Sequence, residues 1–151
     1  MTERFSRFPG TNFIGNPLPA GFGIRFQVAE DQSIFATVIF DESKQGADGI
    51  QHGGAIAAVL DEAMGAAAFE RDKIGYTVTM TYNYKSHIPL HQEILIRARV
   101  EKIDGRKIFA ACSATLPDGT IAVEGTGIFI YSQQLSDQMH ARKPIAQGDK
   151  H

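Results

Sequence analysis

The sequence of 151 residues predicts an α+β fold, in which one long helix lies against a curved antiparallel sheet of about six strands. Three observations lead to this prediction. One apolar segment of helical length lies near the middle of the chain, segments with alternating polarity lie on both sides of it, and short turn motifs join the later ones. Because a helix that is apolar on every side must be buried, we expect the sheet to curl around it.

The central helix is predicted within residues 49–69, with the fully apolar part starting at Ala55. The run His52-Gly53-Gly54 lies at its start, and the pair Asp61-Glu62 lies in its middle. Carboxylates are rarely buried unless they are paired or functional, so this acidic pair is the first indication of a site.

The strands are predicted from alternation and from turn residues. Asp104-Gly105 and Pro117-Asp118-Gly119 are strong hairpin turns between alternating segments. The predicted strands are residues 22–28 and 33–40 before the helix, and 76–87, 93–102, 108–116 and 121–131 after it. In the first strand after the helix, strict alternation would place Thr77, Thr79, Thr81 and Asn83 on one face, and Val78, Met80, Tyr82 and Tyr84 on the other.

The chain length favours a single domain, which we place at residues 1–131. Residues 1–20 contain several prolines and glycines and are expected to form an irregular lead-in. Residues 132–151 show no periodicity, and we interpret them as a polar, loosely attached C-terminal tail.

Composition excludes several classes of function. A formal net charge of −2 argues against a nucleic-acid partner, and no apolar run has the length and freedom from charge of a membrane span. Cys112 is the only cysteine and is interpreted as a core residue, and His87, His91 and Glu93 lack a recognised metal spacing. We therefore expect a cytoplasmic protein with no metal and no cofactor.

The glycines at the start of the helix suggest an oxyanion hole. Helix N-termini carry unpaired N–H groups and a partial positive charge, and glycine allows a ligand oxygen to approach the backbone. Gly53 or Gly54 could therefore donate to a carbonyl oxygen as it becomes negative. The alternative is that both glycines only permit a tight entry into the helix.

Asp61 is the candidate general base or nucleophile, because an apolar setting raises the pKa of a carboxyl group. Asp61 follows Gly54 by seven residues on the same helix face, which corresponds to a rise of roughly 10 Å. One substrate carbonyl cannot contact both groups of one chain, so the site would need Asp61 of a second, antiparallel subunit. The alternative for Asp61 is a purely structural buried carboxylate.

Two neighbouring residues receive weaker assignments. Glu62 points about 100° away from Asp61 around the helix, and we interpret it mainly as a polar or interfacial partner. His52 either orients the loop by bonding a backbone group or binds the substrate.

The motif resembles a known family. His52-Gly53-Gly54 followed by Asp61, with Gly49 before the histidine, resembles the hotdog-fold thioesterases, specifically the PaaI-like and related acyl-CoA thioesterase branch. The run 60–65 is similar to many members of that branch, and the resemblance extends over roughly residues 12–131.

The resemblance implies a hotdog fold, a homodimer or dimer of dimers, and metal-independent hydrolysis of acyl-CoA. It implies that Gly53 or Gly54 polarises the thioester carbonyl, while Asp61 of the other subunit attacks directly or activates water. His52 would fix the loop or contact the thioester, and Thr77 matches a threonine that lines the acyl pocket in some relatives.

Two positions differ from the family pattern. Many relatives carry an asparagine where this chain has Gly46, so that polar contact is either missing or moved to Gln45 or Asp48. An Arg-Pro pair of the family appears here as Ser86-His87 beside Lys85. The predicted substrate-binding residues are Gln45, Gly49, Thr77, Lys85 and Ser86. A non-catalytic acyl-CoA or lipid-binding module is the main alternative, and a hydratase is disfavoured because its histidine is placed differently.

Overall fold

The structure, a computed structural model, describes residues 3–142 apart from the side chain of His140. Its strands are β1 (Arg4–Phe5), β2 (Gln27–Val28), β3 (Ile34–Ile39), β4 (Gly75–Tyr84), β5 (Glu93–Asp104), β6 (Lys107–Thr115) and β7 (Ile121–Tyr131). Its helices are α1 (Asn12–Gly15), α2 (Gly53–Phe69) and α3 (Gln133–Ala141), with a short 3₁₀ turn, η1 (Glu42–Lys44).

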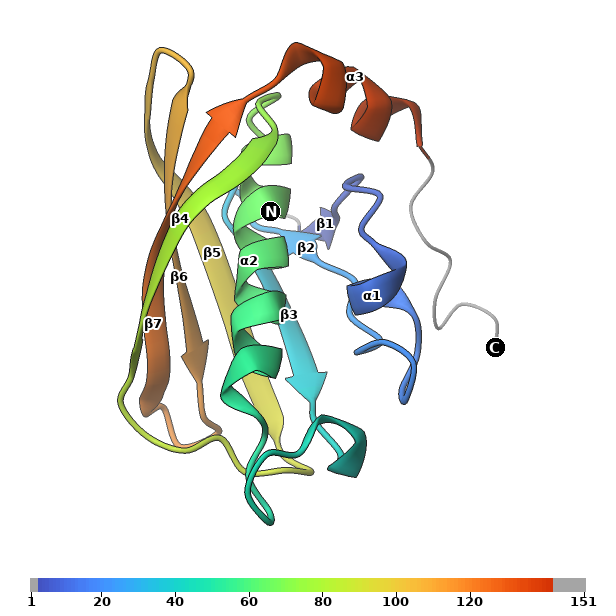
Figure 1. Cartoon of the computed structure of the whole chain (residues 1–151), viewed down its shortest axis with the longest axis vertical. Coiled ribbons are helices and arrows are strands. Elements are labelled where there is room, and N and C mark those ends of the chain that lie inside the picture. The colour runs from blue at the N-terminus through green and yellow to red at the C-terminus, as the bar shows by residue number, and fades with distance from the viewer. Residues whose placement is uncertain (1–2, 143–151) are drawn as a thin grey trace.

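The strands form one seven-stranded antiparallel sheet in the order β1-β2-β3-β5-β6-β7-β4. The long helix α2 lies along the concave side of this sheet (Figure 1). The predicted arrangement of a buried helix and a curled sheet is therefore confirmed, with one strand more than expected.

Helix α2 is buried because nearly all of its side chains are apolar. Ile56, Val59, Leu60, Ala63 and Met64 have no exposed surface and pack with the inward-facing residues of β3, β5 and β6. The helix is capped by His52, whose φ and ψ of −70° and 133° are extended, and it ends at Phe69.

The N-terminal segment and α3 lie on the side of α2 that faces away from the sheet (Figure 1). The ring of Phe8 packs edge-on against Phe69, and Arg4 forms a 2.7 Å ion pair with Glu70. Residues 1–20 are therefore not wholly irregular, since they include β1 and α1. Of the predicted strand 22–28, only β2 pairs as a strand, because the chain before it belongs to the N-terminal segment that packs on the side of α2 facing away from the sheet.

The predicted tail also contains regular structure. Residues 133–141 form α3, in which Ser136 is buried and Leu135 packs against the core. Helix α3 was missed because its apolar residues are few and its burial depends on the surface below it. The rest of the predicted tail, residues 143–151, lies outside the described residues.

A β-bulge in β4 changes which side chains face α2. The pairing with β7 runs from Thr77↔Phe129 directly to Thr79↔Ile128, so Val78 is the extra residue. Phe129 is buried on the inner face, and therefore Thr77 also faces the helix. The strict alternation predicted for this strand is wrong: Thr77 shares the inner face with Met80, Tyr82 and Tyr84, and only Thr79, Thr81 and Asn83 remain outside.

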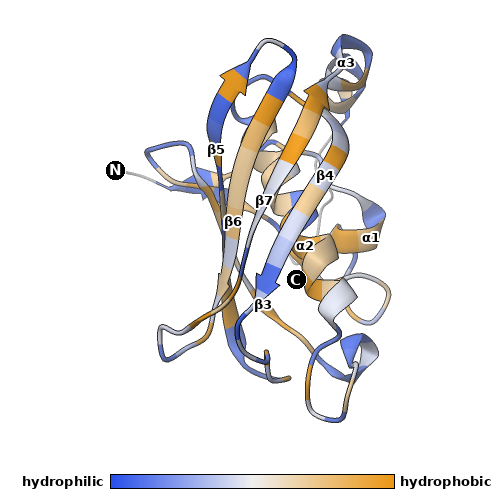
Figure 2. Ribbon diagram, turned by 60° about the vertical axis from the view of Figure 1, so that its left-hand side comes forward, coloured by the Kyte–Doolittle hydropathy of each residue, from blue (hydrophilic) through white to orange (hydrophobic). Residues whose placement is uncertain are grey.

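Strand β4 forms one edge of the sheet and carries exposed apolar side chains. Tyr76 and Val78 are each 60% exposed, and Tyr84 is 51% exposed. Figure 2 shows hydrophobic colour in the first half of β4, next to β7, and a hydrophilic end of the strand. An apolar, unpaired strand edge is a ready surface for pairing with another chain.

None of the helices in the described part of the chain combines the length and the apolar character that are needed to cross a membrane.

Candidate functional site

The first turn of α2 leaves one backbone donor free. Gly54 N–H donates to Nδ1 of His52 at 2.8 Å, while the amides of Ala55 and Ile56 donate to the carbonyl of His52 at 2.9 and 3.3 Å. Among the described residues, none accepts a hydrogen bond from Gly53 N–H. Of the two glycines predicted as oxyanion donors, Gly53 is therefore the one whose N–H is available.

His52 caps the helix with its ring. Because Nδ1 accepts from Gly54 N–H, this nitrogen is unprotonated, and the proton of the neutral ring lies on Nε2. The structure thus shows His52 bonding a backbone group, which is the first of its two predicted roles. Contact between His52 and a substrate stays a prediction.

The carboxylate of Asp61 lies on the side of α2 that faces β4. Thr77 Oγ1 donates to its Oδ1 at 3.0 Å, a contact that exists because the bulge at Val78 turns Thr77 inwards. Burial raises the pKa of Asp61 above its ordinary value, and the hydrogen bond from Thr77 opposes part of that effect. A half-buried carboxylate with a raised pKa and a fixed orientation suits a general base or a nucleophile.

Three side chains of β4 hold this face of α2. Tyr84 Oη donates to the carbonyl of Gly53 at 2.7 Å, and Tyr82 Oη donates to the carbonyl of Ala57 at 3.1 Å. With the contact between Thr77 and Asp61, β4 thus contacts the helix at residues four apart, which share one helix face. Sequence reasoning missed both tyrosine contacts, since alternation alone shows which face a side chain takes and not which atom it reaches.

The free donor and the carboxylate are far apart within one chain. Asp61 lies eight positions after Gly53, which corresponds to a rise of about 12 Å along the helix. A substrate carbonyl bonded to Gly53 N–H is therefore beyond the reach of Asp61 of the same chain.

Glu62 lies about 100° around the helix from Asp61 and is bound within its own chain. Its Oε2 accepts from the amide of Thr11 at 2.8 Å and from the Thr11 hydroxyl at 3.1 Å. Burial raises the pKa of Glu62 to about 7, although the bonds from Thr11 oppose the effect. Glu62 is thus a polar partner of the N-terminal segment.

The loop before α2 contains three of the positions discussed from sequence. Gln45 Oε1 accepts from the amide of Gly49 at 2.7 Å, and Gly49 has a φ of +77°, a conformation that favours glycine. A β-carbon added at Gly46 would lie 3.1 Å from Cα of His52. A side chain at position 46 would therefore require the start of α2 to shift by a few tenths of an ångström.

Lys85 and Ser86 directly follow β4 and are exposed. Both of their amides donate to the carbonyl of Ala122, and Lys85 Nζ forms an ion pair with Glu124 at 2.9 Å. A phosphate group bound by Lys85 would therefore compete with Glu124. The binding roles of Gln45, Gly49, Lys85 and Ser86 stay predictions.

Cys112 is buried on the inner face of β6, and desolvation raises the pKa of its thiol to about 12. A thiol that stays protonated is a poor nucleophile, which supports the interpretation of Cys112 as a core residue. Among the described side chains, no three from His, Cys, Asp and Glu lie close enough to hold a metal ion.

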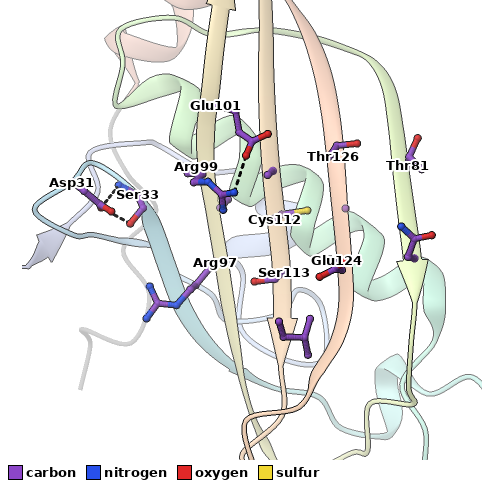
Figure 3. A pocket seen from close by; sticks show the side chains of 15 residues that line it. Asp31, Ser33, Thr81, Arg97, Arg99, Glu101, Cys112, Ser113, Glu124 and Thr126 are labelled. Atoms are coloured by element: carbon purple, nitrogen blue, oxygen red, sulfur yellow. Dashed lines mark hydrogen bonds and ion pairs between the residues drawn. The ribbon is translucent and has the colours of Figure 1, made fainter.

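A hollow of about 510 Å³ lies near the outer face of the sheet, away from Gly53 and Asp61. Its lining includes Arg97 and Arg99 but also Glu101, which pairs with Arg99 at 2.7 Å, and the hydroxyl groups of Ser113 and Thr126 (Figure 3). The charges of both signs give this hollow no preference for a ligand of one charge.

Comparison with known proteins supports the resemblance found in the sequence. The sequence model of the thioesterase superfamily matches residues 48–123, which is half of the chain. The chain is 34% identical over 87 residues to the acyl-coenzyme A thioesterase THEM4 of Mus musculus and 38% identical over 87 residues to that of Xenopus laevis. These matches cover 57% of this chain, which spans less than two fifths of the length of either relative (37% and 39%).

The fold has close counterparts among solved structures. The thioesterase superfamily protein RHA08564 matches 80% of this chain and 59% of its own, with a TM-score of 0.75 and 28% identity. Zebra fish thioesterase superfamily member 2 has the same fold, with a TM-score of 0.66 and 23% identity over 72% of this chain and 81% of its own. With the family match over residues 48–123, these structures establish that this chain, with its hotdog fold, belongs to the thioesterase superfamily.

Proposed function

We propose that this protein is an acyl-CoA thioesterase, which hydrolyses a CoA thioester to a free acid and CoA. The proposal depends on one observation: α2 presents a free Gly53 N–H and an oriented Asp61 carboxylate along the side that β4 holds. The names of the relatives THEM4 and THEM5 support the substrate class, although this chain spans only part of each.

Gly53 N–H would donate to the thioester carbonyl oxygen, because the charge that develops there is stabilised by the donor and by the positive end of the helix. Asp61 of the partner subunit would take a proton from water as the water oxygen bonds to the carbonyl carbon. The tetrahedral intermediate then breaks its C–S bond, and the CoA thiolate leaves and takes up a proton. Direct attack by the carboxylate, followed by hydrolysis of the anhydride, gives the same products.

We propose that the working unit is a homodimer or a dimer of dimers. The rise of about 12 Å between Gly53 and Asp61 of one chain requires a second chain for each site. The exposed apolar edge strand β4, which carries Tyr76 and Val78, supplies a surface for that chain. Two identical helices side by side in antiparallel orientation would create two equal sites.

Within the dimer, the predicted substrate-binding residues would lie around different parts of the acyl-CoA. Lys85 and Ser86 are exposed at the end of β4 near the start of α2, so they could contact phosphate groups. Thr77 lies beside Asp61 and would border the acyl group. Gln45 and Gly49 would shape the loop that carries His52.

A non-catalytic acyl-CoA-binding module is the second candidate function. One observation favours it: Gly46 carries no side chain where the family resemblance implies a polar one, and a β-carbon added there would lie 3.1 Å from Cα of His52. A protein that binds CoA esters but hydrolyses none would support this alternative.

A hydrolysis screen over CoA esters of varied acyl length, aromatic ones included, tests the proposal. The key variant is Gly53→Pro, because proline at the first helical position removes the N–H and suits the helix start. His52 already has the extended backbone that a following proline requires. The matched control is Gly53→Ala, which keeps the N–H, since its new β-carbon would meet Tyr84 only at 3.4 Å.

We expect Gly53→Pro to lower kcat by about 10²–10³-fold and Gly53→Ala to change it by much less. We expect Asp61→Asn to abolish hydrolysis while the dimer stays folded. An active Asp61→Asn enzyme, or equal effects of the two Gly53 variants, would contradict the proposal.

A further inference from the structure

Tyr84 holds the peptide unit next to the free donor. Its hydroxyl donates to the carbonyl of Gly53 at 2.7 Å, and a β-carbon added at Gly53 would lie 3.4 Å from its ring. The Gly54 N–H belongs to the same peptide unit and donates to His52 Nδ1 at 2.8 Å. Because a peptide unit is planar, bonds at both of its ends fix its orientation.

The two peptide units that flank the Gly53 α-carbon are thus both held. The unit before it, which carries the Gly53 N–H, is held by its His52 carbonyl, which accepts from the amides of Ala55 and Ile56 at 2.9 and 3.3 Å. The unit after it depends on Tyr84 and on the His52 ring. Glycine has no β-carbon to restrict rotation, so these bonds limit the directions that Gly53 N–H can take.

We propose that Tyr84 is a positioning residue, whose hydroxyl orients Gly53 N–H toward the thioester carbonyl. This inference rests on the proposed function of Gly53 as the oxyanion donor. An oriented donor stabilises the transition state most when no reorganisation is needed as charge develops. Loss of the Tyr84 hydroxyl should therefore affect kcat, and it should leave the binding of the CoA portion unchanged.

Strand β4 supplies a matched control. Tyr82 lies two residues before Tyr84, and its hydroxyl donates to the carbonyl of Ala57, one helical turn beyond Gly53. The rings of Tyr82 and Tyr84 pack against each other with centroids 6.4 Å apart. Both tyrosines thus tie β4 to α2 through a hydroxyl, but only Tyr84 bonds a peptide unit that flanks Gly53.

The experiment compares Tyr84→Phe with Tyr82→Phe in the full chain. We expect Tyr84→Phe to lower kcat about tenfold with KM unchanged, and Tyr82→Phe to change kcat less than twofold. The second readout is the carbonyl stretching frequency of a bound ketone analogue of acyl-CoA labelled with ¹³C. This frequency should be lowered in the wild type and in Tyr82→Phe, and should return toward the unbound value in Tyr84→Phe.

Equal kcat values and equal carbonyl frequencies in the two variants would overturn the inference. If Tyr84→Phe does not fold, 3-fluorotyrosine placed at position 84 and at position 82 replaces the two variants. The more acidic hydroxyl should then change kcat and the frequency only at position 84, and equal responses would again overturn the inference. If the wild type hydrolyses no CoA ester, the proposed function fails, while the frequency still reports whether Tyr84 orients the donor.

Discussion

Replacement of Glu62 by glutamine tests how the N-terminal segment is held on α2. The carboxylate is half-buried beside Thr11, and the charged groups near it are Asp61 on the same helix and Arg142 just after α3. Glutamine keeps an oxygen that can accept both bonds from Thr11, but it carries no charge at any pH. Glu62→Gln therefore removes the titration and keeps the contact.

The magnitude follows from the pKa. An ordinary glutamate has a pKa of 4.5, and burial raises that of Glu62 to about 7. This difference is equivalent to about 3 kcal/mol, and since Glu62 is partly exposed, solvent screening reduces it to about 1–3 kcal/mol. Because the folded state binds the proton more tightly, this stability is fully present below pH 4.5 and is lost as the pH rises through 7.

The assay is urea unfolding of the wild type and of Glu62→Gln between pH 4 and pH 8. We expect equal unfolding free energies near pH 4 and a variant that is about 1–3 kcal/mol more stable at pH 8. The control is Thr11→Val, which removes a hydroxyl that lowers the Glu62 pKa and should move the pH dependence to higher pH. A difference in unfolding free energy between wild type and Glu62→Gln that stays constant from pH 4 to pH 8 would show that the pKa of Glu62 is not raised by folding.

Three further predictions concern the site and its surroundings. Thr77→Val removes the hydroxyl that lowers the Asp61 pKa, so the acid limb of the pH profile of kcat should move to higher pH; an unchanged limb would disconnect Thr77 from Asp61. Cys112 should resist thiol reagents at pH 8 in the folded protein, since its pKa is about 12, and rapid labelling would contradict its burial. Val78→Lys places a charge on the exposed edge of β4 and should give an inactive monomer in light scattering and activity assays; an active monomer would exclude a shared site.

Much of the fold could be predicted because its signals are local. Helix α2 is a continuous apolar run, β5, β6 and β7 alternate in polarity, and the turns between these strands contain glycine at positive φ, at Gly105 and Gly119. Helices α1 and α3 escaped prediction because α1 has only four residues and α3 owes its burial to the surface beneath it. The bulge at Val78 could not be predicted either, because it is defined by the pairing of β4 with β7 and the sequence of β4 alone does not show that pairing.

The candidate site was predictable as a motif but not as a set of contacts. The glycine pair and Asp61 could be identified from helix geometry and from the family resemblance. The choice between Gly53 and Gly54 required the structure, because it depends on the rotamer of the His52 ring. The contact between Thr77 and Asp61 depends on the bulge, and that between Glu62 and Thr11 joins residues that are 51 apart in sequence.

A purified heterodimer shows whether each site combines Gly53 of one chain with Asp61 of another. One chain carries Gly53→Pro and the other Asp61→Asn, and each variant alone forms an inactive homodimer. In a shared arrangement, one of the two sites keeps both wild-type groups, so we expect about half of the wild-type activity. An inactive heterodimer would show that both groups must come from one chain, and would exclude a site shared between two chains.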